Sequence, residues 1–189
     1  MDETFHRLEV ASLDLGPDVR AVGLELIDPE TREPVTGGEA ARIWAAIVPA
    51  LAGEEPWCLD FFAHLERVQE YCRSRGIAFR EPNTRTIVVA QQAAEPLAAL
   101  FERFAGETFG VRAGGMAAPG DADVENGLAQ RGVDGYHTAF SHYLFCAVCD
   151  FENGFLTLLS ERLEALEVIR RAQPALDGLE VEVAVAGPV

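Results

Sequence analysis

A cluster of histidines and cysteines has the residue types and spacing most suited to chemistry. His137, His142, Cys146 and Cys149 lie within thirteen positions and include half of the chain's histidines and half of its cysteines. In a helix successive residues turn by about 100°, so His142, Cys146 and Cys149 would share one face. Nitrogen and sulfur donors suit zinc or copper, and His137 could join if the helix begins later or frays. The cluster therefore suggests a soft-metal site.

The conformation of residues 136–151 decides this hypothesis, and the sequence leaves it open. In a strand, Cys146 and Cys149 would point to opposite sides of the sheet and could not share a metal. The spacing also lacks the two separated knuckles of zinc fingers. The commoner role of such residues is that of buried core thiols and hydrogen-bonded imidazoles. No cofactor is required by the sequence, and zinc or copper is the metal that the cluster would favour.

Several catalytic chemistries lack their residues. All fifteen basic residues are arginine, which excludes a lysine Schiff base and the Gly-Lys pair of the usual phosphate-binding loop. None of the four serines lies in a Gly-x-Ser-x-Gly elbow. Cys146 lies one helical turn from His142, but the negative net charge would raise rather than lower the pKa of its thiol. The catalytic residues are therefore unknown, and the sequence does not decide whether the chain is an enzyme.

Four arginines oppose the overall charge over a short stretch. Arg73, Arg75, Arg80 and Arg85 are interrupted by a single acid, Glu81. Guanidinium groups bind carboxylates and phosphates with two parallel hydrogen bonds, so these residues are a candidate anion-binding site. The alternative is a set of solvated ion pairs that contribute little.

The charge balance is the most distinctive global property. The chain carries 31 acidic and 15 basic residues, which gives a formal net charge of −16. Nucleic-acid binding depends on basic side chains that displace counterions, so DNA and RNA are not expected as partners. A basic protein or peptide is favoured, because opposite charges speed association. The alternative is that the charge serves only solubility.

The sequence also predicts the cellular setting. No stretch approaches the roughly 20 apolar residues that a membrane-spanning helix needs, so we expect no membrane association. The first residues carry acids where a secretory signal would be basic and then apolar. Without an export signal the four cysteines should be reduced thiols. We therefore expect a cytoplasmic protein.

The elements that would position these residues follow from hydrophobic periodicity. The predicted strands are 5–15, 19–27, 84–90, 109–112 and 179–185, and the predicted helices lie around 44–51, at 56–75, at 95–105 and from about 160 to 169. Two strand–helix–strand units, at 84–112 and 155–186, suit an α+β fold. We expect one globular domain over residues 1–189, with an antiparallel or mixed sheet and helices packed mainly on one face.

Residues 113–135 are rich in Gly, Ala and Asp and show no periodicity, which predicts a long flexible loop.

The sequence leaves three hypotheses about function. The leading one is a non-catalytic acidic binding, inhibitor or accessory protein for a basic partner. The second is a metal-binding protein or metalloenzyme centred on the His/Cys cluster. The third is a small-molecule enzyme with its pocket under the 113–135 loop, faced by Trp57, Asp60, His64 and Glu66. The oligomeric state stays open.

Overall fold

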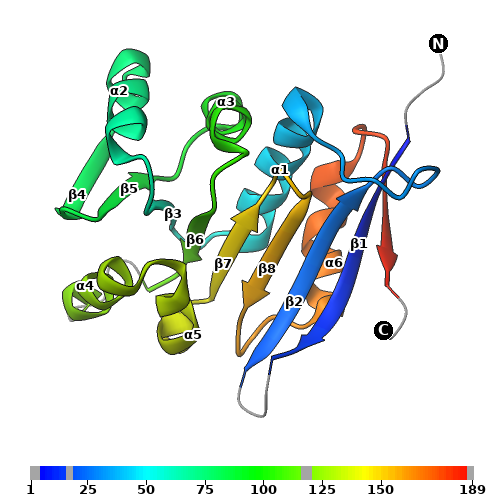
Figure 1. Cartoon of the computed structure of the whole chain (residues 1–189). Coiled ribbons are helices and arrows are strands. Elements are labelled where there is room, and N and C mark those ends of the chain that lie inside the picture. The colour runs from blue at the N-terminus through cyan, green and yellow to red at the C-terminus, as the bar shows by residue number, and fades with distance from the viewer. Residues whose placement is uncertain (1–4, 16–18, 116–120, 187–189) are drawn as a thin grey trace.

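One long mixed sheet forms the centre of the protein. The computed structural model describes residues 5–15, 19–115 and 121–186, and within them nine strands pair in the order β4-β5-β3-β6-β7-β8-β2-β1-β9 (Figure 1). The strands are β1 (His6–Asp14), β2 (Arg20–Ile27), β3 (Trp57–Phe61), β4 (Phe79–Asn83), β5 (Thr86–Ala90), β6 (Phe109–Ala113), β7 (Phe145–Asp150), β8 (Phe155–Leu159) and β9 (Val181–Val185). The predicted α+β class with a mixed sheet is confirmed.

Helical crossovers connect strands that are not neighbours. Helices α1 (Gly37–Ala52), α3 (Ala94–Phe104) and α6 (Ala165–Leu176) follow β2, β5 and β8 and lead to β3, β6 and β9. Neighbouring strands are antiparallel except β1 and β9, which are parallel. The units predicted at 84–112 and 155–186 correspond to β5–α3–β6 and β8–α6–β9, and α1 builds a further unit of this kind.

The main core lies between the sheet and these helices. Helix α1 contacts both α3 and α6, and its fully buried Trp44 stacks on Phe151 with ring centroids 4.7 Å apart. Alternate strand residues such as Leu59, Val111 and Leu158 point into this core. Helix α2 (Leu65–Arg75) adds Val68 and Cys72 to the same core, so most helices cover one face.

The opposite face, which we call the front face, is covered over part of its width. Helix α4 (Asp121–Arg131), the 3₁₀ turn η1 (Gly132–Gly135), helix α5 (Tyr136–Ala139) and the 3₁₀ turn η2 (Phe140–His142) lie on this side. They build a smaller apolar cluster with β2, β7 and β8. The front of β8, β2 and β1 carries no helix among the described residues, as Figure 1 shows.

The helix predicted over 56–75 is wrong in its first part. Residues Trp57–Phe61 form strand β3 in the middle of the sheet, and the helix begins only at Leu65. All five residues of β3 are buried, because core packs on both sides of the strand. A strand buried on both faces has no polar–apolar alternation, so its apolar residues also fit helical spacing. Asp60 is therefore on a strand and not on a helix.

Two further segments differ from expectation. Most of the loop predicted at about 113–135 is helical, since α4 and η1 fill 121–135; residues 116–120 lie outside the described residues. Residues 136–151 are not one helix, because α5 and η2 are short and Phe145–Asp150 form strand β7. The Glu152-Asn-Gly turn closes the β7–β8 hairpin. Among the described residues, no helix is both long and apolar enough to span a membrane.

Candidate functional site: a buried polar network and an open sheet face

A buried ion pair lies on the front face where α4 and α5 cover the sheet. Asp60 on β3 and Arg112 on β6 are 2% exposed each. The Arg112 Nε donates to Asp60 Oδ2 at 2.6 Å, and its Nη2 donates to Asp60 Oδ1 at 2.8 Å. Such a two-bonded pair satisfies the buried carboxylate and half of the guanidinium fork. Removing either partner would leave the other buried charge without its two-bonded partner.

Tyr136 attaches α5 to this pair. Its hydroxyl donates to Asp60 Oδ2 at 2.5 Å, and its ring is fully buried. The ring lies directly on β6 at Gly110, where a Cβ atom would come 1.8 Å from the Tyr136 hydroxyl oxygen. A glycine is therefore needed at position 110 for Tyr136 to reach Asp60.

Glu125 attaches α4 to the same network. Its Oε1 accepts from Nη1 and Nη2 of Arg112 at 3.2 Å each, and its Oε2 accepts from Nη1 of Arg80 on β4 at 2.6 Å. A second Arg80 nitrogen, Nη2, also donates to Glu125 Oε1. Tyr143 completes the shell by accepting from Arg112 Nη1 at 3.0 Å. The carboxylate of Glu125 is thus shared by two guanidinium groups.

The network fixes the protonation of its members. Burial acts to lower the pKa of Arg112, but the Asp60 carboxylate outweighs this effect and the pKa lies well above its ordinary value. Burial, and then the charge of Asp60, raises the pKa of the Tyr136 hydroxyl. The hydrogen bond from Arg80 is the main cause that lowers the pKa of Glu125. At neutral pH Arg112 and Glu125 are therefore charged and the Tyr136 hydroxyl keeps its proton, so the hydrogen bonds that hold α4 and α5 on the sheet stay formed.

The His/Cys cluster is not brought together. Cys146 on β7 lies opposite Arg112 in the β6–β7 strand register and belongs to the smaller apolar cluster on the front face. Cys149 belongs to the main core on the other side of the sheet. His137 and His142 are exposed residues of α5 and η2. Among the described residues, no three histidine, cysteine or carboxylate side chains are grouped as a metal ion would require. Metal binding stays a prediction from the sequence that the positions of these residues do not support.

The four cysteines are free, buried thiols. Burial is the first cause that raises the pKa of Cys58, Cys146 and Cys149 above the ordinary thiol value. Burial also raises the pKa of Cys72 to about 11. Because the thiolate is the nucleophile and the metal ligand, these cysteines have the character of core residues.

The four candidate anion-binding arginines lie on both sides of the sheet. Arg80 points to the front face and pairs with Glu125. Arg73 lies over the ring of Phe79 at 5.5 Å, and Arg75 lies over the ring of Tyr71 at 5.7 Å, both among the residues of the helix-covered side. Arg85 is exposed in the β4–β5 turn. Of the four, Arg80 alone joins the buried network described here, with Arg112 as a partner that the sequence prediction did not include.

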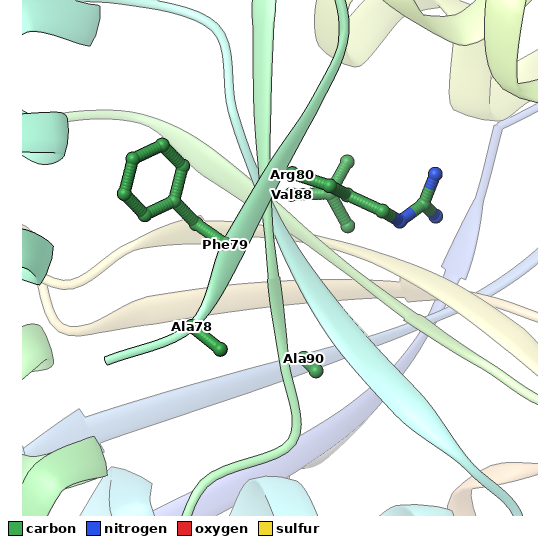
Figure 2. A pocket seen from close by; sticks show the side chains of 5 residues that line it. All are labelled: Ala78, Phe79, Arg80, Val88 and Ala90. Carbon is green, nitrogen blue, oxygen red and sulfur yellow. The ribbon is translucent and has the colours of Figure 1, made fainter. Parts of the chain in front are cut away.

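A cavity of about 220 Å³ adjoins Arg80 at the end of the sheet, lined by Ala78, Phe79, Arg80, Val88 and Ala90. Figure 2 shows Arg80 and Val88 on one side of the β4–β5 ribbon and Phe79 on the other. In the register of β3 and β5, Val88 lies opposite Asp60 and Ala90 lies opposite Cys58. The cavity is therefore one strand away from the buried ion pair.

The part of the front face that no described helix covers, which we call the open face, carries three acids in one cross-strand row. Strand register aligns Asp150, Phe155, Glu25, Glu9 and Ala184 across β7, β8, β2, β1 and β9. All five are half-buried. Glu9 is paired with Arg32 at 2.5 Å, whereas Glu25 forms no ion pair with any described side chain. The open face is thus a partly apolar surface with excess negative charge.

Sequence reasoning missed Arg112 and Tyr136, and it placed Asp60 on the wrong element. A signal for Arg112 was present, because an arginine inside the apolar strand Phe109-Gly-Val-Arg-Ala needs a buried partner. Nothing in the sequence shows that this partner is Asp60, which lies 52 positions earlier.

Comparison of the chain with protein-family models, with curated proteins and with solved structures gave no match.

Proposed function

We propose that this chain is a non-catalytic binding protein that engages a basic protein or peptide on the open face of its sheet. The observation that carries the proposal is the cross-strand row of Asp150, Phe155, Glu25 and Glu9, on a surface that no helix of the described residues covers (Figure 1). A formal net charge of −16 adds a long-range field that attracts such a partner.

The composition of the row suits protein recognition. Phe155 lies between Asp150 and Glu25, so an aromatic side chain is flanked by carboxylates. Buried aromatic anchors carry much of the free energy of protein–protein binding, and surrounding charges set specificity and association rate. A partner that presents an apolar residue among arginines or lysines would match this pattern.

The test compares two charge reversals of equal size. Glu25→Arg changes the open face, whereas Glu70→Arg changes an exposed residue of α2 on the other side of the sheet. Each tagged variant and the wild type is used to capture proteins from host lysate, and captured proteins are identified by mass spectrometry. We expect the wild type and Glu70→Arg to capture the same basic proteins. We expect Glu25→Arg not to capture them.

The salt dependence of capture and the comparison of the two variants distinguish binding at the open face from attraction by net charge alone. Binding at the open face should weaken as sodium chloride rises, because exposed charges are screened beyond about 8 Å at physiological ionic strength. Equal loss in Glu25→Arg and Glu70→Arg would show that only net charge matters and would remove the open face from the proposal. Captured partners that are not basic, or capture that does not change with salt, would contradict the proposal itself.

A further inference from the structure

The Arg80–Glu125–Arg112 arrangement has the form of an occupied carboxylate-binding site. Arg80 comes from β4, Arg112 from β6, and the carboxylate between them from α4. Arg80 uses Nη1 and Nη2 for the two oxygens of Glu125, while both Nη atoms of Arg112 donate to Oε1 at 3.2 Å. Two guanidinium groups on one carboxylate is a way in which proteins bind acidic ligands. Here the bound carboxylate belongs to the protein itself.

An apolar space adjoins the side chain of Arg80. The cavity of about 220 Å³ includes Arg80 in its wall, together with Val88 and two exposed alanines, Ala78 and Ala90. Ala90 lies two residues from Val88 along β5, so both side chains are on the front face with Arg80. The space could hold a short hydrocarbon chain or a small ring whose charged end reaches Arg80.

We propose that this end of the front face binds a small organic carboxylate with a short apolar body, and that Glu125 takes the place of its carboxylate when no ligand is bound. The group now held by the arginines is itself a carboxylate, which selects this anion. The apolar lining selects the hydrocarbon body, and the cavity volume limits its size. The site is separate from the open face and does not depend on the function proposed above.

Exposure decides which arginine meets the ligand. The side chain of Arg80 is 49% exposed, whereas that of Arg112 is 2% exposed and held by Asp60. The ligand carboxylate therefore binds Arg80 first and replaces Glu125 there. The side chain of Glu125 is 16% exposed, and its displacement would break its own bonds to Arg112 but neither of the two bonds between Arg112 and Asp60.

Competition with Glu125 gives the proposal a distinctive consequence. A tethered competitor acts at an effective concentration on the order of millimolar, and the apparent affinity of the ligand falls by the fraction of sites that the competitor leaves free. Removing the charge of Glu125 should therefore tighten ligand binding by at least about tenfold. Loss of a carboxylate that merely supported the fold would not tighten binding.

The experiment uses hexanoate as the probe and the full chain as the protein. Binding is measured by titration of the methyl NMR signals of Val88, with hexan-1-ol as the uncharged counterpart and inorganic phosphate as a different anion. We expect hexanoate to shift these signals in the wild type and to bind Glu125→Gln at least about tenfold more tightly. We expect Arg80→Gln to weaken binding at least about tenfold, because a charge-assisted hydrogen bond is lost.

Two variants locate the site. Ala90→Phe fills the cavity from an exposed position and should abolish binding, whereas Arg85→Gln removes a neighbouring exposed arginine and should leave it unchanged. The proposal is overturned if hexanoate shifts neither the wild type nor Glu125→Gln, or if Arg80→Gln and Ala90→Phe bind it as the wild type does. If hexan-1-ol bound as tightly as hexanoate, the proposed role of the ligand's charge would be wrong. If phosphate bound as tightly as hexanoate, the proposed role of the ligand's apolar body would be wrong.

Discussion

At the scale of single residues, the front face is organised by one arginine that cannot reach solvent. Arg112 needs Asp60, Glu125 and Tyr143 to satisfy its donors, and Asp60 in turn accepts a hydrogen bond from the Tyr136 hydroxyl. A buried ion pair of this kind is weak evidence for stability, because desolvation offsets most of the attraction. Its effect is to fix which segments can lie on the sheet, since α4 and α5 each bring one partner.

The contact between Gly110 and Tyr136 predicts that replacing this strand glycine by alanine destabilises the protein. Alanine normally stabilises a strand relative to glycine, but Gly110→Ala should lower the free energy of unfolding by at least about 1–3 kcal/mol, because its methyl group collides with the Tyr136 ring. Urea unfolding measures the loss. In the Tyr136→Ala background the same substitution should cost little, since the space is then vacant. A loss that is equal in both backgrounds would contradict the assigned contact.

At the scale of elements, the predictability of each segment follows its burial. Segments with one buried face, such as 95–105 and 179–185, were predicted correctly because their periodicity marks that face. Strand β3 and strand β7 were missed or ambiguous because they lie in the middle of the sheet, where core on both sides removes the polar–apolar alternation. The site shared this difficulty, since Asp60 lies on β3 and its partners are distant in sequence.

The free energy of unfolding should depend on pH through Glu125 of helix α4. The folded-state pKa of Glu125 lies below its ordinary value of 4.5, mainly because Arg80 donates to its carboxylate and also because Arg112 is close. A depressed carboxyl pKa stabilises the folded state above the unfolded pKa, and this contribution is lost as pH falls through the folded pKa. The wild type should therefore exceed Glu125→Gln in free energy of unfolding at about pH 6, and the difference should shrink below about pH 4.5.

Urea unfolding of both proteins across this range checks the prediction. Glu70→Gln removes an exposed carboxylate of α2 that forms no ion pair with any described arginine, and it should follow the wild type throughout. A constant difference between the wild type and Glu125→Gln at every pH would mean that the substitution acts through packing and not through the charge of Glu125.

At the scale of the whole molecule, the two ends of the front face use charge in different ways. Near β4, α4 brings a carboxylate to arginines, and the charges are matched and partly buried. Over β8, β2 and β1, acids outnumber the arginines Arg7 and Arg32 that pair with Glu182 and Glu9. The excess of 16 negative charges must therefore be carried by exposed surface, and that surface repels itself.

Self-repulsion predicts that salt stabilises this protein. Exposed ion pairs contribute about 0–1 kcal/mol each and are weakened by salt, whereas screening relieves the repulsion among all uncompensated carboxylates. With a formal net charge of −16 the second effect should win, so the midpoint of thermal unfolding should rise as sodium chloride increases at neutral pH. The rise should shrink as pH approaches the isoelectric point of about 4.5, where the net charge vanishes. A midpoint that falls with salt at neutral pH would show instead that specific ion pairs outweigh repulsion across the surface.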